Sequence, residues 1–171
     1  MYIRPCILAL GVLIPSVAFA TDDELAKYQN ILKTCYEKAG AGEDIAHCKG
    51  QMAEACKNGE EGGWSTLGMV TCTMAETRAW DHYLNVEYRS ALEGLRDMDK
   101  DEAVHFPEFA NRADSLRDAQ RAWISFRDAE CGLAYALWGS GSMRNIAASA
   151  CQLDMTAARI LMLKNVGSEM Q

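Results

Sequence analysis

Six cysteines downstream of an apolar N-terminal segment constrain the fold more than any other feature of this 171-residue chain. They are Cys35, Cys48, Cys56, Cys72, Cys131 and Cys151. An even number of cysteines in an exported protein is typical of a disulfide framework. Six cysteines can form 15 different sets of three bridges, so the positions of the helices must choose among them.

The first twenty residues have the features of a secretory signal peptide. Arg4 precedes an apolar run over residues 7–19, and the segment ends in AFA, a small-x-small cleavage pattern. We expect cleavage near Ala20, which also removes Cys6. No later segment approaches the roughly 18 uninterrupted apolar residues of a membrane helix. The pattern therefore predicts a soluble mature protein, residues 21–171, in the periplasm or outside the cell, with no membrane insertion.

The charge balance points away from nucleic acid and towards a cationic partner. The formal charge of the whole chain is −7, and loss of Arg4 with the signal segment makes it −8. An acidic chain is repelled by phosphate backbones and by anionic lipid surfaces. We therefore expect no nucleic-acid partner, and a basic protein fits the charge better.

Apolar residues recur at helical spacing through most of the mature chain, and alternating strand patterns are missing. Trp80, Leu84, Tyr88, Ala91 and Leu95 form one such stripe. The sequence predicts an all-α fold, a small disulfide-stapled bundle of antiparallel helical hairpins. The predicted helices cover residues of about 22–38, 43–57, 67–97, 107–138 and 143–165.

Glycine, proline and charge mark the predicted connections. The stretch NGEEGGWS, residues 58–65, is a loop by its glycines, and GSGS ends the fourth helix. Thr21 is a candidate N-cap for the first helix. The charged stretch from Asp97 to Phe106 is predicted to be irregular, and Pro107 to open the next helix in its first turn.

Helical hairpins suggest a disulfide pairing, because residues equidistant from a turn face each other. Cys131 and Cys151 are each ten residues from Gly141, so a bridge would join the last two helices. Cys35 and Cys48 lie symmetrically about the Ala41-Gly42 turn, which leaves Cys56 to pair with Cys72. A swap among the four N-terminal cysteines remains an alternative. Each bridge would stabilise the fold by about 2–4 kcal/mol.

The C-terminal two thirds of the chain carries several ordered motifs. They are CTMAETRAWDHYLNVEYRSAL from Cys72, LRDAQRAWISFRDAEC over residues 116–131, GSGSM over 139–143, and MTAARILML over 155–163 after Cys151. In their order and spacing they resemble the LprI-type lysozyme-inhibitor domain family over about residues 56–164. With the signal peptide (1–20) set apart, the resemblance divides the rest of the chain into an N-terminal helical extension (21–55) and an LprI-like helical domain (56–171), which we expect to form one compact unit.

The resemblance implies a small, helical, disulfide-bonded envelope protein, and at least one member of the family inhibits lysozyme. Two features depart from the family. The chain lacks a lipid-attachment box after its apolar run, and it has the extension with the additional pair Cys35 and Cys48. The extension could create a binding face or cover one.

Most of the family motif residues are interpreted as structural. Trp123 and Phe126 are predicted core anchors. Gln120 and Arg127 share a helix face from which they could bond a neighbouring helix or the GSGS carbonyls, and Asp128, Asp154 or Arg159 could join them in a charge network. Buried polar groups need such partners. Asn85 and Tyr88 are expected to hydrogen-bond between helices.

Two segments are candidates for partner binding. The turn Trp138 to Arg144 combines glycines and serines with Trp138 and Met143, and a disulfided hairpin would hold it rigidly; Ser140, Gly141 and Ser142 form its tip. The acidic run of residues 97–102, with Asp99 and Asp101, could meet a basic enzyme. A plain helix–helix turn and a solvated charged loop are the alternative interpretations.

Signatures of catalysis and of metal binding are missing from the sequence. His47, His82 and His105 lack ligand spacing, and the GSGS stretch lacks the lysine of a phosphate loop. There is no Cys-x-x-Cys motif and no suitable nucleophile elbow. We therefore expect a protein that is not an enzyme, with no catalytic residue, metal or cofactor.

These features favour an exported binding protein, in particular a lysozyme inhibitor that acts by stoichiometric binding to a basic cell-wall hydrolase. The alternative is an immunity or accessory protein that binds another envelope toxin or enzyme. The sequence leaves the oligomeric state, the lysozyme class and the binding face open.

Overall fold

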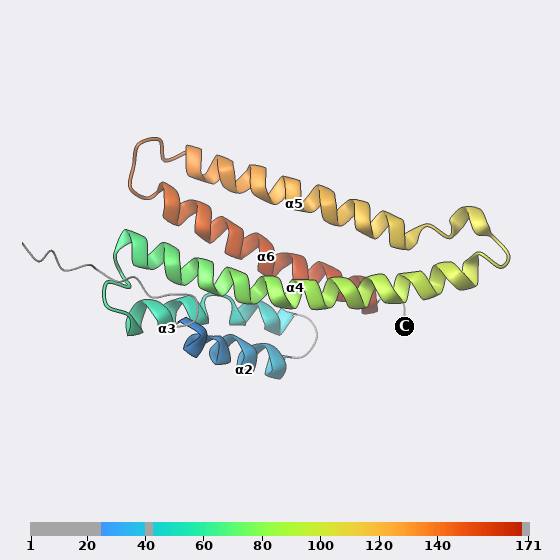
Figure 1. Cartoon of the computed structure of the whole chain (residues 1–171), viewed down its shortest axis with the longest axis horizontal. Helices are drawn as coiled ribbons and strands as arrows, with labels where there is room; N and C mark the ends of the chain where they lie inside the picture. The colour runs from blue at the N-terminus through green and yellow to red at the C-terminus, as the bar shows by residue number, and fades with distance from the viewer. Residues whose placement is uncertain (1–24, 40–42, 169–171) are drawn as a thin grey trace, which may run out of the picture.

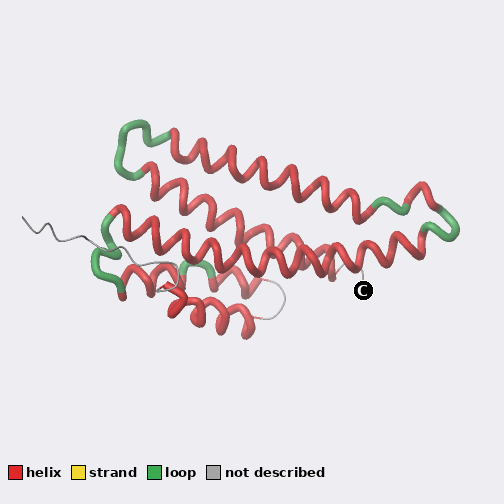
Figure 2. The backbone as a smooth tube through the Cα atoms, viewed as in Figure 1, coloured by secondary structure: helices red, strands yellow, loops and turns green. Residues whose placement is uncertain are grey.

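A computed structural model describes residues 25–39 and 43–168, and these are almost entirely helical, with no strand in the described ranges (Figures 1 and 2). The signal segment and the Thr21 cap lie outside them. The all-α prediction is thus confirmed. The helices are 3-10 turn η1 (Ala26–Tyr28), α2 (Gln29–Ala39), 3-10 turn η2 (Glu43–Cys48), α3 (Gln51–Gly59), α4 (Thr66–Glu102), 3-10 turn η3 (Pro107–Phe109), α5 (Arg112–Ala136) and α6 (Arg144–Ser168).

The long helices form an antiparallel bundle with α6 lying between α4 and α5 (Figure 1). The contact of α4 with α6 is the most extensive in the molecule. Helices α2 and α3 cover the side of α4 away from α5, so α5 forms the outer edge of the bundle (Figure 2). The chain reverses between α5 and α6 at the same end of the bundle at which α4 begins.

The core follows the stripe that the sequence predicts on α4. Trp80 is fully buried, Leu84, Ala91 and Leu95 are at most 8% exposed, and Tyr88 packs partly buried against them. Facing them from α6 are four buried apolar side chains, Leu153, Ala157, Ile160 and Leu163. Burial of apolar area between these two faces is the main stabilising term of such a bundle.

The six cysteines of the described residues form three disulfides, paired as the helical-hairpin symmetry predicts. Cys35 bonds Cys48, Cys56 bonds Cys72, and Cys131 bonds Cys151, with Cα–Cα distances of 5.6, 5.6 and 5.4 Å. The first joins α2 to η2, the second α3 to α4, and the third α5 to α6.

The second predicted helix, 43–57, is in fact two segments. The 3-10 turn η2 ends at Cys48, and α3 begins after Gly50. Gly50 has a φ of +91°, a left-handed backbone conformation that glycine adopts more readily than other residues. This left-handed residue breaks the helical path, so α3 leaves in a new direction and lies along α4 (Figure 1).

The stretch after Asp97 was predicted to be irregular, and this is wrong as far as Glu102, because α4 continues to that residue. The acidic side chains have cationic partners: Asp97 lies 3.9 Å from Lys100, and Asp99 and Glu102 pair with Arg112 at the start of α5. Opposite charge removes the repulsion that would oppose a helix here. Pro107 opens only the 3-10 turn η3, and α5 starts later, at Arg112.

Phe126 is not a core anchor, in contrast to the prediction, because its side chain is 58% exposed on α5. Trp123 is partly buried and packs against the core. Leu116, Gln120 and Cys131 mark the inner face of α5, and Phe126 lies off that face.

Residues 144–166 of α6 are long and apolar enough to cross a membrane by length and composition alone. In the structure this helix is the inner member of the bundle. One of its faces packs on α4, and Cys151 bonds it to α5, which is a charged helix. Of this apolar stretch, 33% is buried within the bundle.

Candidate functional site

The turn between α5 and α6 depends on two glycines. Gly139 has a φ of +51°, which reverses the chain just after α5. The N–H of Gly141 donates to the Trp138 carbonyl at 2.8 Å, and a Cβ on Gly141 would lie only 2.9 Å from that oxygen. Side chains at these two positions would therefore strain or open the turn.

A disulfide fixes the base of the turn. Cys131 and Cys151 join α5 to α6 about two helical turns below the reversal. The Sδ of Met155 lies 3.8 Å from each of the two bonded sulfurs and fills the space beside them. The turn thus projects from a cross-linked helix pair, which limits its freedom before any partner binds.

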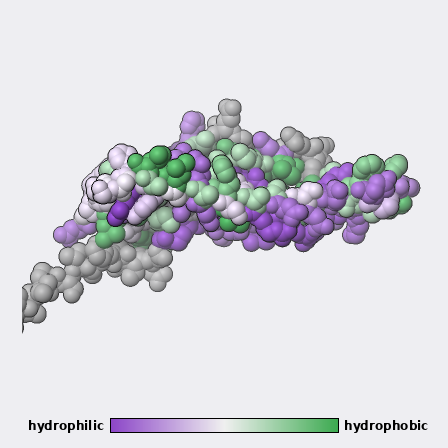
Figure 3. All heavy atoms as spheres, turned by 90° about the horizontal axis from the view of Figure 1, so that it is seen from above, coloured by the Kyte–Doolittle hydropathy of each residue, from purple (hydrophilic) through white to green (hydrophobic). Residues whose placement is uncertain are grey.

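The tip carries exposed apolar side chains. Leu137 is 77% exposed, Trp138 49% and Met143 40%, and Tyr135 adds to the same end of α5. In the view onto α5, pale and green atoms gather at this end of the molecule (Figure 3). Contiguous apolar surface of this kind on a small protein is typical of a binding site.

The polar groups of the turn complete this surface. The guanidinium of Arg144 lies 5.2 Å from the Tyr135 ring centroid, and its Nη1 donates to the Gly139 carbonyl at 3.5 Å. Ser140 and Ser142 are exposed. The tip therefore offers an aromatic ring, hydroxyls and one cation from a fixed backbone.

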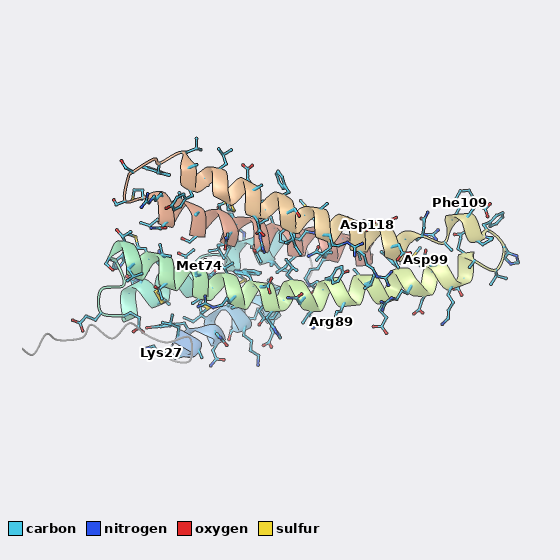
Figure 4. All side chains as sticks on the ribbon, turned by 45° about the horizontal axis from the view of Figure 1, so that its top comes forward. Lys27, Met74, Arg89, Asp99, Phe109 and Asp118 are labelled. Carbon is cyan, nitrogen blue, oxygen red and sulfur yellow. A yellow bond between two sulfur atoms is a disulfide. The ribbon has the colours of Figure 1, made fainter. Side chains whose placement is uncertain are left out.

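The acidic run lies at the opposite end of the bundle, so the structure does not bring the two predicted binding segments together (Figure 4 labels Asp99 there). The 25-residue helix α5 separates them by about 38 Å. Asp101 is exposed and remains a candidate for partner binding.

Asp99 has a structural role at that end. Its carboxylate accepts hydrogen bonds from the backbone N–H of Arg112 at 3.0 Å and of Ala113 at 2.8 Å, where α5 begins. Partial burial favours the protonated form, but these bonds and the Arg112 charge outweigh it and hold the pKa of Asp99 below its ordinary value. The carboxylate acts as the N-terminal cap of α5.

Motif residues of α5 and α6 form a polar network. The Nε of Arg159 donates to Gln120 Oε1 at 3.0 Å, and burial lowers the pKa of Arg159. The guanidiniums of Arg127 and Arg159 lie 5.1 and 5.6 Å from the centroid of the Trp123 ring. Arg127 also pairs with Asp128 at 2.9 Å. This network fixes α5 against α6 through cation–π and hydrogen-bond contacts.

Asp154 was a candidate for that network, but its carboxylate pairs instead with Lys49, at 2.5 Å. Lys49 follows the first disulfide, at Cys48. The pair therefore ties the N-terminal part of the chain to α6.

Comparison with known proteins assigns most of the chain to a family. A family model described as "Lysozyme inhibitor LprI" matches residues 56–163, which include the turn, the polar network and the last two disulfides. The chain belongs to the LprI family. A protein of Rhizobium meliloti (strain 1021), described as uncharacterized, is 32% identical over 102 residues, which cover 60% of this chain and 73% of that protein. No solved structure matches the chain.

Within the LprI match, Asn85 does not bond between helices, in contrast to the prediction. It is exposed, and its Nδ2 donates to the carbonyl and the side chain of Asp81 one turn earlier, at 2.8 and 2.9 Å. Tyr88 is partly buried and packs on the core. Asn85 therefore stabilises α4 locally.

The sequence interpretation missed Glu76, a fully buried carboxylate of the LprI match. Its two oxygens accept from the backbone N–H of Gly50 and of Ala53, each at 2.6 Å, and from Nε1 of Trp80 at 2.9 Å. Gly50 and Ala53 are the N-cap and third residue of α3, so Glu76 caps that helix from α4. A signal was present, because Glu76 lies four residues before Trp80 on the buried stripe.

Helix α2, which precedes the family match, packs on α4 through an aromatic cluster. Tyr36 of α2 stacks on Tyr83 of α4, with centroids 4.0 Å apart, and its hydroxyl donates to Glu87 at 2.7 Å. Burial, and then the hydrogen bond to Glu87, raise the pKa of Tyr36. Lys164 of α6 reaches the same carboxylate at 3.1 Å. The cluster thus joins three helices.

The described ranges hold no group of three histidine, cysteine or acidic side chains placed to bind a metal ion. An open groove of about 830 Å³ runs between α2 and α4, lined among others by Lys33, Glu37 and His82.

Proposed function

We propose that this protein is an exported inhibitor of a lysozyme, and that it acts by stoichiometric binding through the turn from Trp138 to Arg144. Membership of the lysozyme-inhibitor family supports the class of function. The leader of residues 1–20 and the disulfides favour an oxidising envelope compartment such as the periplasm.

The exposed apolar tip on a cross-linked hairpin carries the proposal. Trp138 is half exposed with no core role, although tryptophan in a small protein is normally kept largely buried. Tryptophan and arginine dominate the energetics of protein interfaces, and the turn has one of each. Because the Cys131–Cys151 bridge already orders the hairpin, little further entropy is lost on binding.

A protruding turn suits a concave target. Hydrolases that cut wall polysaccharides bind their substrate in an open cleft, and a rigid convex tip can enter such a cleft and exclude the glycan. The aromatic ring of Trp138 and the hydroxyls of Ser140 and Ser142 resemble the mixture of apolar and hydroxyl groups that sugars present. The negative charge of the chain would speed encounter with a basic hydrolase.

The test is a wall-lysis assay with the oxidised mature protein titrated against a basic lysozyme at low and moderate salt. We expect inhibition to saturate at a fixed molar ratio and to weaken as salt rises. Trp138→Ala should weaken binding by about 30-fold or more, the effect of losing an interface hot spot.

Phe109→Ala is the matched control, because Phe109 is 60% exposed and lies at the opposite end of the bundle (Figure 4). This variant should inhibit as the wild-type protein does. If the folded, fully disulfided protein fails to inhibit lysozymes of any class, the proposal is wrong. If Phe109→Ala and not Trp138→Ala abolishes inhibition, the turn is not the binding site.

A further inference from the structure

Helix α5 has a second apolar face, which the bundle does not cover. On this face, exposed apolar residues recur at alternating intervals of three and four residues, which is the pattern of a coiled-coil seam. We call this set the outer seam: Ala119, Ala122, Phe126, Ala129, Leu133 and Ala136.

The outer seam is distinct from the face that holds α5 in its own bundle. The inner face contributes Leu116, Gln120 and Cys131, which are at most 7% exposed. Phe126 and Leu133, on the seam, are 58% and 52% exposed. A helix at the surface of a monomer normally turns polar residues to water on this side. The exposure of the Phe126 and Leu133 side chains therefore needs an explanation.

We propose that the outer seam binds a second copy of this chain, with the two α5 helices antiparallel about a two-fold axis between Arg127 and Asp128. In this register the seam is self-complementary. Phe126 meets Ala129 of the partner subunit, Leu133 meets Ala122 of the partner subunit, and Ala119 meets Ala136 of the partner subunit.

Each large side chain therefore packs on an alanine. Alanine lets two helix backbones approach closely, and a Phe or Leu then fills the space beside it, so the four central layers have similar widths. Only the two terminal layers, in which Ala119 faces Ala136 of the partner subunit, are narrower. A parallel pair would place Phe126 against its own copy and alanine against alanine, which gives wide and empty layers in turn. The alternation of large and small residues thus favours the antiparallel dimer.

Position and charge allow this contact. α5 forms the outer edge of the bundle, and α2 and α3 lie on the far side of α4 (Figure 1). The two copies of Asp118 fall at opposite ends of the seam, about 28 Å apart. The two copies of Glu130 lie closer, about 8 Å apart along the axis, and oppose association weakly.

The size of the seam sets the expected affinity. From Ala119 to Ala136 it is about 26 Å long. Two helices in contact over this length bury roughly 1,000 Å² in total, near the lower limit of specific interfaces. We therefore expect a reversible dimer with a dissociation constant in the range of roughly 1–100 μM.

Sedimentation velocity of the oxidised mature protein from about 1 μM to 1 mM tests the proposal. Phe126→Ala removes the large side chain that packs on Ala129 of the partner subunit. Ala129→Phe places a second phenylalanine opposite Phe126 and so overfills the same layer. Each should raise the dissociation constant by about tenfold or more. The double variant Phe126→Ala with Ala129→Phe exchanges large and small within the same layer and should restore dimerisation.

Phe109→Ala, the same change at an equally exposed site off the seam, should leave the dissociation constant unchanged. Because the chain is acidic, salt should strengthen this dimer, whereas it should weaken the binding of a basic lysozyme, so the two proposals fail independently. A protein that is monomeric up to 1 mM would overturn the inference. So would a dimer that is insensitive to the single variants, or one that the double variant does not restore.

Discussion

Replacing Glu76 with glutamine tests whether one buried carboxylate holds the extension on the LprI domain. The wild-type oxygens accept three hydrogen bonds, two on Oε1 and one on Oε2. Glutamine has nearly the same shape but only one accepting oxygen. If that oxygen serves Gly50 and Trp80, the new NH₂ group faces the N–H of Ala53, and two donors oppose each other.

The cost follows from these contacts. A lost bond with an unsatisfied buried donor costs about 1–3 kcal/mol. The two remaining bonds change from a charged to a neutral acceptor and weaken, and the charge at the N-terminus of α3 is lost. We therefore expect Glu76→Gln to lower the free energy of unfolding by about 2–4 kcal/mol. For a chain of this length that corresponds to a fall in Tm of about 5–15 °C.

The assay is thermal and urea unfolding at pH 7, followed by circular dichroism with all three disulfides intact. Glu93→Gln is the matched control, because Glu93 is an exposed residue of the same helix. It should change stability by no more than about 0.5 kcal/mol. If Glu76→Gln melts within about 2 °C of Glu93→Gln, the carboxylate does not cap α3 in the way described.

Three further outcomes are expected. Asp99→Asn should lower Tm at pH 7, and the difference in Tm from the wild type should shrink as melts are taken below about pH 4. The reason is that a carboxylate whose pKa is lowered in the folded state stabilises the protein above its ordinary pKa and loses this effect as the pH falls through the folded-state pKa. A difference in Tm that grows on acidification would contradict this. The double variant Cys131→Ser with Cys151→Ser should lower the free energy of unfolding by about 3 kcal/mol in urea titrations, and it should also weaken lysozyme inhibition. Unchanged inhibition would show that the turn needs no cross-link. Gly139→Ala, at a φ of +51°, should cost about 1–2 kcal/mol in the same titration. Gly132→Ala, within α5 where a Cβ meets open space, should instead stabilise the protein by about 0.5–1 kcal/mol, because alanine favours the helix over glycine.

The helices, the disulfide pairing and the network around Gln120 could be predicted because each depends on spacing within one or two neighbouring helices. Cys131 and Cys151 are equidistant from their turn, and Trp80 and Leu84 lie on one stripe. The predictions failed where contacts with a segment distant in the sequence determine the local structure. Asp99 could be placed in a helix only with the knowledge that α5 begins beside it, and Glu76 needs a helix N-terminus that lies 23 residues or more away.

Phe126 shows another limit of the sequence. Its seven-residue spacing to Leu133 is a correct helical signal, but α5 has two apolar faces, and periodicity alone does not say which one meets the core. Within the candidate site, the exposure of Trp138 and the φ of Gly139 come from the structure, whereas the glycine–serine turn itself was visible in the chain.

The order of the disulfides has a consequence for the making of this protein. From Cys35 onward the six cysteines bond in three consecutive pairs, with separations of 13, 16 and 20 residues, and no bridge crosses another. A chain that crosses a membrane N-terminus first presents its cysteines in that same order. An oxidase that joins each newly emerged thiol to a preceding thiol that is still free therefore produces the native disulfides directly, without a disulfide isomerase to correct the pairing.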